Sequence, residues 1–174
     1  MKSAKKILAL ILAGVMALAL LTGCGKATSL NRTMAEGLAE YAKSSLAELG
    51  NENNISVSYQ VPELRRDIAP LFDETWITKD NSGKDALTNA AKETLKNILS
   101  PYISDTSAVT FQAADVTDFK TPFAETANLV GSQIAFRAIA SGLYADSVTS
   151  IRVAVVHKNV NGRTYALTVI IVEK

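Results

Sequence analysis

The sequence contains one cysteine, Cys24, and one histidine, His157, among its 174 residues. A single cysteine excludes an internal disulfide, so core packing must stabilise the folded part. A single imidazole excludes a metal site built from several histidines, and any site at His157 would need carboxylate or water partners. The sequence therefore assigns no metal ligand and no cofactor, and His157 is interpreted as an ordinary residue of a strand.

Motifs of catalysis are also absent. The sequence has no Gly-x-Ser-x-Gly elbow, no Gly-x-Gly-x-x-Gly and no P-loop. Ser82-Gly83-Lys84 has the wrong spacing for a Ser-x-x-Lys nucleophile. No residue is assigned a catalytic role, and no ligand-binding residue is named.

Clustered positive charge is scarce. Three lysines lie within the first 23 residues, and the remaining 151 residues carry 15 basic and 17 acidic side chains, a formal charge of −2. Arg65 and Arg66 are the only adjacent basic pair of that part, and Asp67 follows directly. Nucleic-acid binding requires clustered Lys and Arg to neutralise phosphates, so we expect no nucleic-acid partner.

The N-terminus has a pattern typical of export. Residues 1–6 form a basic segment with three lysines, and the 15 residues from Ile7 to Leu21 are apolar apart from Gly14. That run is shorter than the roughly 20 residues needed to span a membrane, and it matches the hydrophobic region of a cleavable signal. An uncleaved helix with an incidental cysteine is the alternative.

The residues that follow, Leu21-Thr22-Gly23-Cys24, resemble the lipobox of bacterial lipoproteins. Small residues at Thr22 and Gly23 let the peptide lie extended in a protease cleft, and the Cys24 thiol is the nucleophile that accepts a diacylglyceryl group. The resemblance implies cleavage before Cys24 and anchoring at the extracytoplasmic face of a bacterial membrane. Two or more acyl chains hold a protein stably there.

These features divide the chain into a signal peptide (1–23), a small and polar lipidated tether (24–32) and one domain (33–174). Apolar residues that recur every three or four positions predict helices, and alternation of apolar with polar residues predicts strands. We expect helices over 33–49 and 82–99 and from Thr121-Pro122 onward, a helix broken at Pro70 over 63–76, and strands over 55–61 and 109–116. Thr33 with Glu36, and Ser82 with Asp85, are the expected helix caps.

The C-terminus predicts a β-hairpin. Residues 151–160 and 163–172 flank Asn161-Gly162, a dipeptide favoured in two-residue type I′ turns. This turn would place Val156 opposite Leu167, with both faces of the strands apolar and covered by helices. The sequence thus predicts an α+β fold, an α-β-α sandwich with a mainly antiparallel sheet of about four strands.

Two stretches resemble the CAP superfamily (cysteine-rich secretory, antigen 5 and pathogenesis-related proteins). One is Leu30-Asn31-Arg32 leading to Gly37-Leu38, which is similar to the family's opening helix, and the other is the closing helix and hairpin. The resemblance implies an α-β-α sandwich. The family's two cleft histidines have no counterparts, and its Gly-Glu-Asn segment is only echoed by Glu125-Thr126-Ala127-Asn128, so no site residue is carried over.

Three functions follow as hypotheses. The first is a non-enzymatic binding or structural module of the cell envelope, with an envelope protein or a wall polymer as partner. The second is an extracellular hydrolase that uses paired carboxylates, drawn from the acidic residues Asp73, Glu74, Asp115 and Asp118. The third is an accessory subunit of an envelope complex. Trp76 is expected in the core or, alternatively, at the rim of a binding cleft.

Overall fold

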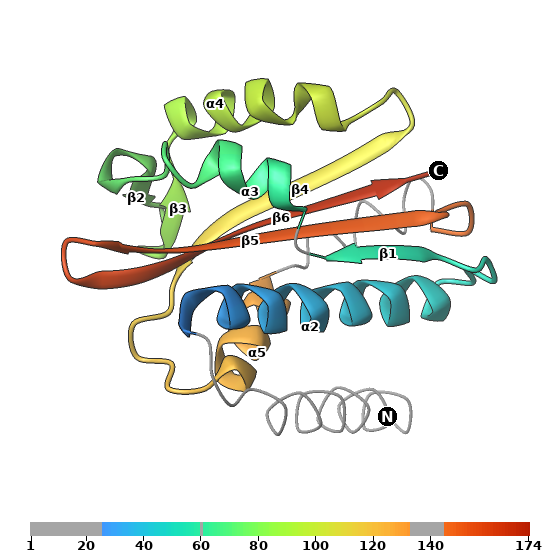
Figure 1. Cartoon of the computed structure of the whole chain (residues 1–174), viewed down its shortest axis with the longest axis horizontal. Coiled ribbons are helices and arrows are strands. Elements are labelled where there is room, and N and C mark those ends of the chain that lie inside the picture. The colour runs from blue at the N-terminus through green and yellow to red at the C-terminus, as the bar shows by residue number, and fades with distance from the viewer. Residues whose placement is uncertain (1–25, 60, 133–144) are drawn as a thin grey trace.

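The computed structural model describes residues 26–59, 61–132 and 145–174 (Figure 1). Leu21, Thr22, Gly23 and Cys24, and with them the predicted signal and lipidation site, lie outside the described residues. Among the helices described, none combines the length and apolar character needed to cross a membrane.

The centre of the fold is the predicted C-terminal hairpin, made of β5 (Ser150–Val160) and β6 (Arg163–Glu173). Both turn residues have positive φ, 51° at Asn161 and 79° at Gly162, as a type I′ turn requires. Val156 lies opposite Leu167. The predicted turn and register are therefore confirmed.

Two further strands complete a four-stranded sheet of order β1-β5-β6-β4. Strand β4 (Ser107–Asp115) runs antiparallel to β6, whereas β1 (Ser56–Tyr59) runs parallel to β5. One parallel pair among three leaves the sheet mainly antiparallel, as predicted.

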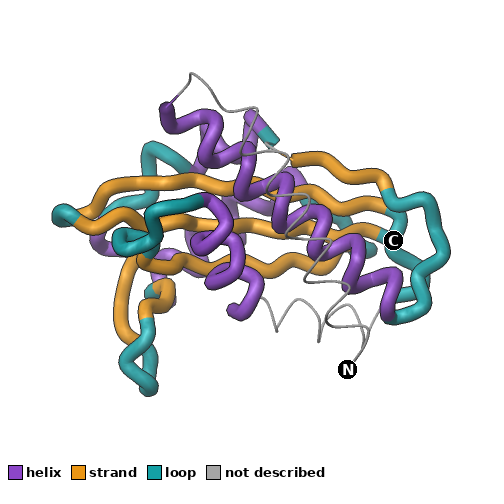
Figure 2. Tube along the Cα trace, turned by 90° about the horizontal axis from the view of Figure 1, so that it is seen from below, coloured by secondary structure: helices purple, strands orange, loops and turns teal. Residues whose placement is uncertain are grey.

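Helices cover both faces of this sheet. Figures 1 and 2 show α2 (Lys26–Glu48) and α5 (Pro122–Ser132) on one face, and α3 (Pro62–Ile68) and α4 (Asn89–Leu99) on the other. Alternate residues of β5 belong to two hydrophobic cores, one on each face of the sheet. Ile151, Val153 and Val155 pack toward α2. Ala154 and Val156 pack toward α3 and α4. The predicted α+β fold with helices on each face is confirmed.

The first described helix begins earlier than predicted. It starts at Lys26 and includes residues expected to form a tether, so Thr33 and Glu36 lie inside the helix instead of capping it. Tertiary contacts explain the difference: Asn31 is buried against β5, and the Arg32 guanidinium lies 5.9 Å from the ring centre of Tyr59.

The predicted helix over 82–99 is wrong in its first third. A small hairpin of β2 (Ile77–Lys79) and β3 (Asp85–Leu87) occupies that stretch, and its turn includes Gly83 at φ 77°. The helix α4 begins only at Asn89, where the Thr88 hydroxyl accepts a hydrogen bond from the Ala91 amide at 3.2 Å. Thr88, not Ser82, is the cap.

Other element predictions are confirmed. The region around Pro70 is broken into α3 and a short 3-10 turn, η1 (Glu74–Trp76). Trp76 is buried against Phe72, with ring centroids 5.8 Å apart, so it is a core residue and not a rim residue.

The predicted start of α5 is also confirmed. There the Thr121 hydroxyl accepts a hydrogen bond from the Ala124 amide. The predicted continuation of that helix over 133–144 lies outside the described residues. A further 3-10 turn, η2 (Ser100–Tyr102), follows α4.

Replacing Thr168 by valine is expected to raise the free energy of unfolding by about 1 kcal/mol. The Thr168 side chain on β6 is fully buried, and within the described residues its hydroxyl has no hydrogen-bond partner. Valine keeps the shape and removes the unsatisfied polar atom. Urea unfolding of the two proteins, with Thr164→Val at a half-buried position of the same strand as control, measures the difference. A loss of stability in Thr168→Val would show that the hydroxyl is satisfied.

Candidate functional site: a groove beside strand β4

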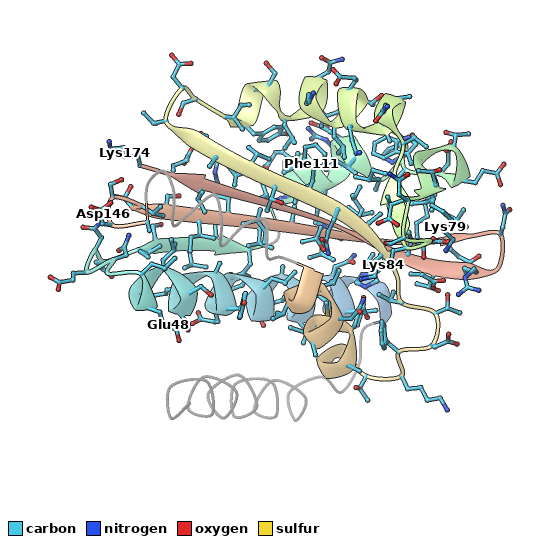
Figure 3. The ribbon with its side chains drawn as sticks, turned by 180° about the vertical axis from the view of Figure 1, so that it is seen from behind. Glu48, Lys79, Lys84, Phe111, Asp146 and Lys174 are labelled. Atoms are coloured by element: carbon cyan, nitrogen blue, oxygen red, sulfur yellow. The ribbon has the colours of Figure 1, made fainter. Side chains whose placement is uncertain are left out.

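An open groove of about 680 Å³ runs beside β4, between the β2–β3 hairpin and α5. Residues 111–115 of β4 form its floor, Ala127 and Asn128 of α5 form one wall, and the hairpin forms the other. The volume lies in the range of pockets that hold ligands, about 300–1,000 Å³. Figure 3 views the molecule with β4 in front and labels Phe111 at mid-strand and Lys79 and Lys84 on the hairpin.

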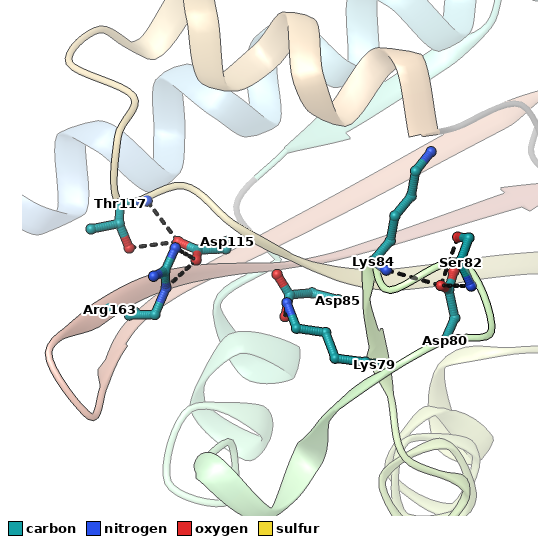
Figure 4. A network of polar contacts seen from close by, with 8 residues as sticks. All are labelled: Lys79, Asp80, Ser82, Lys84, Asp85, Asp115, Thr117 and Arg163. Carbon is teal, nitrogen blue, oxygen red and sulfur yellow. Dashed lines mark hydrogen bonds and ion pairs between the residues drawn. The ribbon is translucent and has the colours of Figure 1, made fainter.

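Two ion pairs are fixed at this groove (Figure 4). The Lys79 ammonium lies 2.8 Å from the Asp85 carboxylate, across the paired ends of β2 and β3. Asp115 at the end of β4 is paired with Arg163 of β6 and accepts two hydrogen bonds from Thr117. Burial of Asp115 opposes ionisation, but the bonds from Thr117 and Arg163 outweigh it and hold the pKa of this carboxyl below its ordinary value.

Asp80 shapes the turn of the hairpin. Its carboxylate accepts hydrogen bonds from the Ser82 hydroxyl and amide, at 2.7 and 2.8 Å, and from the Lys84 amide at 3.0 Å. These bonds, led by the one from the Ser82 hydroxyl, lower the pKa of Asp80 below its ordinary value. Residues 80–84 therefore form a hydrogen-bonded turn between β2 and β3.

The free energy of unfolding is expected to depend on pH partly through the ionisation of Asp80. Because its pKa is lower in the folded chain than in the unfolded one, its ionised form stabilises the fold above the unfolded value of about 3.9. This contribution is lost as the pH falls through the folded-state pKa. Between pH 6 and pH 3 the free energy of unfolding, measured with urea, should fall less in Asp80→Asn than in the parent. Asp105→Asn, at an exposed position, is the control. Equal losses in Asp80→Asn and the parent would contradict the assignment.

Two lysines at the groove have no ion pair within the described part of the chain. Lys84 lies on the hairpin and Lys92 on α4, and both are exposed. Figure 4 shows the Lys84 side chain stretched away from Asp80 and Asp85, with no contact drawn at its ammonium. Since Lys79 and Arg163 are already paired with carboxylates, Lys84 and Lys92 give the groove an excess of positive charge.

The acidic residues considered for hydrolysis do not form one group with a shared set of contacts. Asp73 and Glu74 lie near the β5–β6 turn, where Asp73 accepts from Thr75 and Glu74 accepts from Asn161. The hydrogen bond from the Thr75 hydroxyl lowers the pKa of Asp73. Asp115 instead lies beside the groove and is paired with Arg163, and Asp118, three residues further along the chain, is exposed.

A second polar cluster is buried between the sheet and the helices. The single histidine, His157 of β5, faces Asn31 of α2 through Nδ1 at 2.5 Å and Glu125 of α5 through Nε2. The side chains of His157 and Glu125 are only 7% and 4% exposed. His157 is therefore more than the ordinary strand residue expected, because it joins three elements.

The hydrogen bonds of this cluster fix where its protons lie. The His157 backbone amide donates to the Asn31 side-chain oxygen at 3.1 Å, so that oxygen is an acceptor. The same oxygen faces Nδ1, which must then be the protonated ring nitrogen. The contact between Nε2 and the Glu125 carboxyl also needs one proton, on either partner. The cluster thus satisfies its buried polar groups internally and presents no free base.

Sequence reasoning missed Glu125 as the partner of His157, and it missed the three lysines of the groove. No three His, Cys, Asp or Glu side chains of the described residues gather as a metal site. Comparison with protein-family models, with curated proteins and with solved structures gives no match.

Proposed function

We propose that this chain is a non-enzymatic binding module of the bacterial cell envelope, held by lipid at Cys24 on the extracytoplasmic face of the membrane. The observation that supports the binding role is the open groove beside β4, where Lys84 and Lys92 have no ion-pair partner among the described residues. The proposed location at the membrane rests on residues 21–24, which resemble a lipobox. The α-β-α layering is what the resemblance to the CAP superfamily implies, and membership of that family stays a prediction.

The states of the carboxylates favour binding over hydrolysis. A glycosidase-like acid–base pair needs one carboxyl that holds its proton near neutral pH, which requires a raised pKa. Asp73 and Asp115 both have lowered pKa values and serve as ionised hydrogen-bond acceptors. Glu74 is engaged by the Asn161 amide. These roles are structural.

A photo-crosslinking amino acid placed at Ala127 tests the binding role in living cells. Ala127 is exposed on α5 and lines the groove, whereas Ser58, exposed on β1, lies at the opposite edge of the sheet and serves as the control position. We expect a discrete crosslinked product from Ala127 and none from Ser58. Protease digestion identifies an envelope protein as the partner, including a complex to which this chain is accessory, and muramidase digestion identifies a wall polymer. Absence of a product specific to Ala127 would overturn the proposal.

A further inference from the structure

Among the residues that the structure describes, strand β4 leaves one long edge of the sheet unpaired. It comprises nine residues and pairs there with β6 alone, whereas β1, the strand at the other edge, has four. Long exposed edges carry rows of backbone donors and acceptors ready to pair with another chain, and proteins usually shorten or cover them. The length of the β4 edge therefore needs an explanation.

The backbone groups that face outward can be identified. The Val116 amide donates to the Thr164 carbonyl at 2.8 Å, and the Lys174 amide donates to the Thr106 carbonyl at 3.3 Å. In an antiparallel pair, hydrogen-bonded residues alternate with residues whose N–H and C=O groups face away. Even-numbered residues of β4 therefore bond to β6, and the groups of Phe111 and Ala113 point outward.

The groove lies along this outward edge. Strand β3 packs close to β4 but pairs only with β2, and within the described residues no backbone hydrogen bond joins β3 to β4. Residues 111–115 of β4 bound the groove, so the outward groups of Phe111 lie beside open space. Ala113 is only 5% exposed, and its outward groups lie at the floor of the groove.

The charges at the groove indicate that its binding partner is acidic. Lys79 and Arg163 are neutralised by Asp85 and Asp115, so an incoming segment meets the ammonium groups of Lys84 and Lys92, which form no ion pair within the described ranges. Like charges brought to such a site are rejected, and carboxylates are attracted. An anionic wall polymer would satisfy the lysines, but it would leave the outward amides and carbonyls of β4 without matched partners.

We propose that the outer edge of β4 binds an extended, acidic segment of a partner protein, which adds a strand to the sheet and places its carboxylates near Lys84 and Lys92. This mode of recognition takes affinity from main-chain hydrogen bonds and specificity from side chains. The inference rests on the proposed binding function and names the chemistry of the partner.

The test uses the full-length lipoprotein purified in detergent and a fluorescent seven-residue peptide of alternating Val and Glu. Three comparison probes isolate the contributions: the same peptide with Lys in place of Glu, the same peptide N-methylated at alternate amides, and polyphosphate. N-methylation keeps the charge but removes the donors needed for strand pairing. We expect binding of the unmodified acidic peptide, at least tenfold weaker binding of the methylated and Lys peptides, and weakening by added salt.

Variants of the lysines complete the test. Lys84→Glu with Lys92→Glu should weaken binding of the acidic peptide at least tenfold, because two attractions become repulsions. Lys96→Glu is the matched control, since Lys96 lies one turn along α4 from Lys92, is exposed and is paired with Glu93. It should leave binding within twofold of the parent.

Three outcomes would overturn the inference: no binding of the acidic peptide, equal binding of the N-methylated peptide, or tight binding of polyphosphate alone. A wall-polymer adduct at Ala127 would also overturn it, yet leave the proposed binding function intact. If neither adduct nor peptide binding is found, both proposals fail.

Discussion

Replacing His157 by alanine is expected to lower the free energy of unfolding by about 3 kcal/mol, the upper end of the cost of leaving a buried polar group without its partner. The side chain of Glu125 is 4% exposed, and without the imidazole its carboxyl would lie between α5 and the sheet with its main partner gone. The Asn31 oxygen would lose one of its two donors as well. Urea unfolding of the full chain measures the effect.

A double variant separates the pair from simple loss of packing. Changing both His157 and Glu125 to leucine removes the two polar groups together, and replacing a buried pair by apolar residues is often close to neutral. The double variant should therefore lose less stability than the sum of the two single leucine variants, with a coupling of at least about 1 kcal/mol. Additive losses would show that the two side chains do not depend on each other.

Replacing Cys24 by alanine is expected to abolish fatty acylation, because the chain contains no other thiol to accept a diacylglyceryl group. Incorporation of labelled palmitate should fall from one modified N-terminus per chain to none. The variant should also keep residues 1–23, since the lipidated cysteine is the substrate for cleavage in the bacterial lipoproteins whose lipobox residues 21–24 resemble.

Mass spectrometry of the N-terminus gives the second readout. The parent protein should begin at Cys24 and carry the added mass of its acyl chains. The control variant Thr28→Ala, a short way beyond the cysteine, should behave as the parent does. A parent protein with a free thiol, or with residues 1–23 intact, would contradict the proposed anchor.

The parts of the fold that depend on local pattern could be predicted from the sequence. The hairpin of β5 and β6 follows from Asn161-Gly162 and from apolar residues on both faces of the flanking strands, so its register was correct. The cap at Thr121 was also correct. In both places a few neighbouring residues determine the conformation.

Two features of the fold were missed, one a short local hairpin and the other a groove that depends on distant contacts. The β2–β3 hairpin has strands of only three residues, too short for alternation to identify, and Asp80 to Gly83 has the composition of a helix start as well as of a turn. The groove is formed by this hairpin together with β4 and α5, which are separated along the chain. Its charge balance depends on which lysines find carboxylates after folding.

One signal for the buried cluster was present in the sequence. His157 occupies the same alternate row of its strand as Ile151, Val153 and Val155, which the structure places against α2. A polar side chain in such a row is buried and requires a partner. The sequence could not name Glu125 or Asn31, because 32 and 126 residues separate them from His157.

The two strands at the centre of the sheet are the last two in the sequence, and this order has a kinetic consequence. In the described part of the chain β1 pairs with β5 and β4 with β6, so neither finds its neighbour until residues 150–173 have been synthesised. An incomplete chain lacks the template on which its earlier segments assemble. Under the proposed export this delay would be an advantage, because premature collapse would obstruct passage of the unfolded polypeptide through a translocation channel.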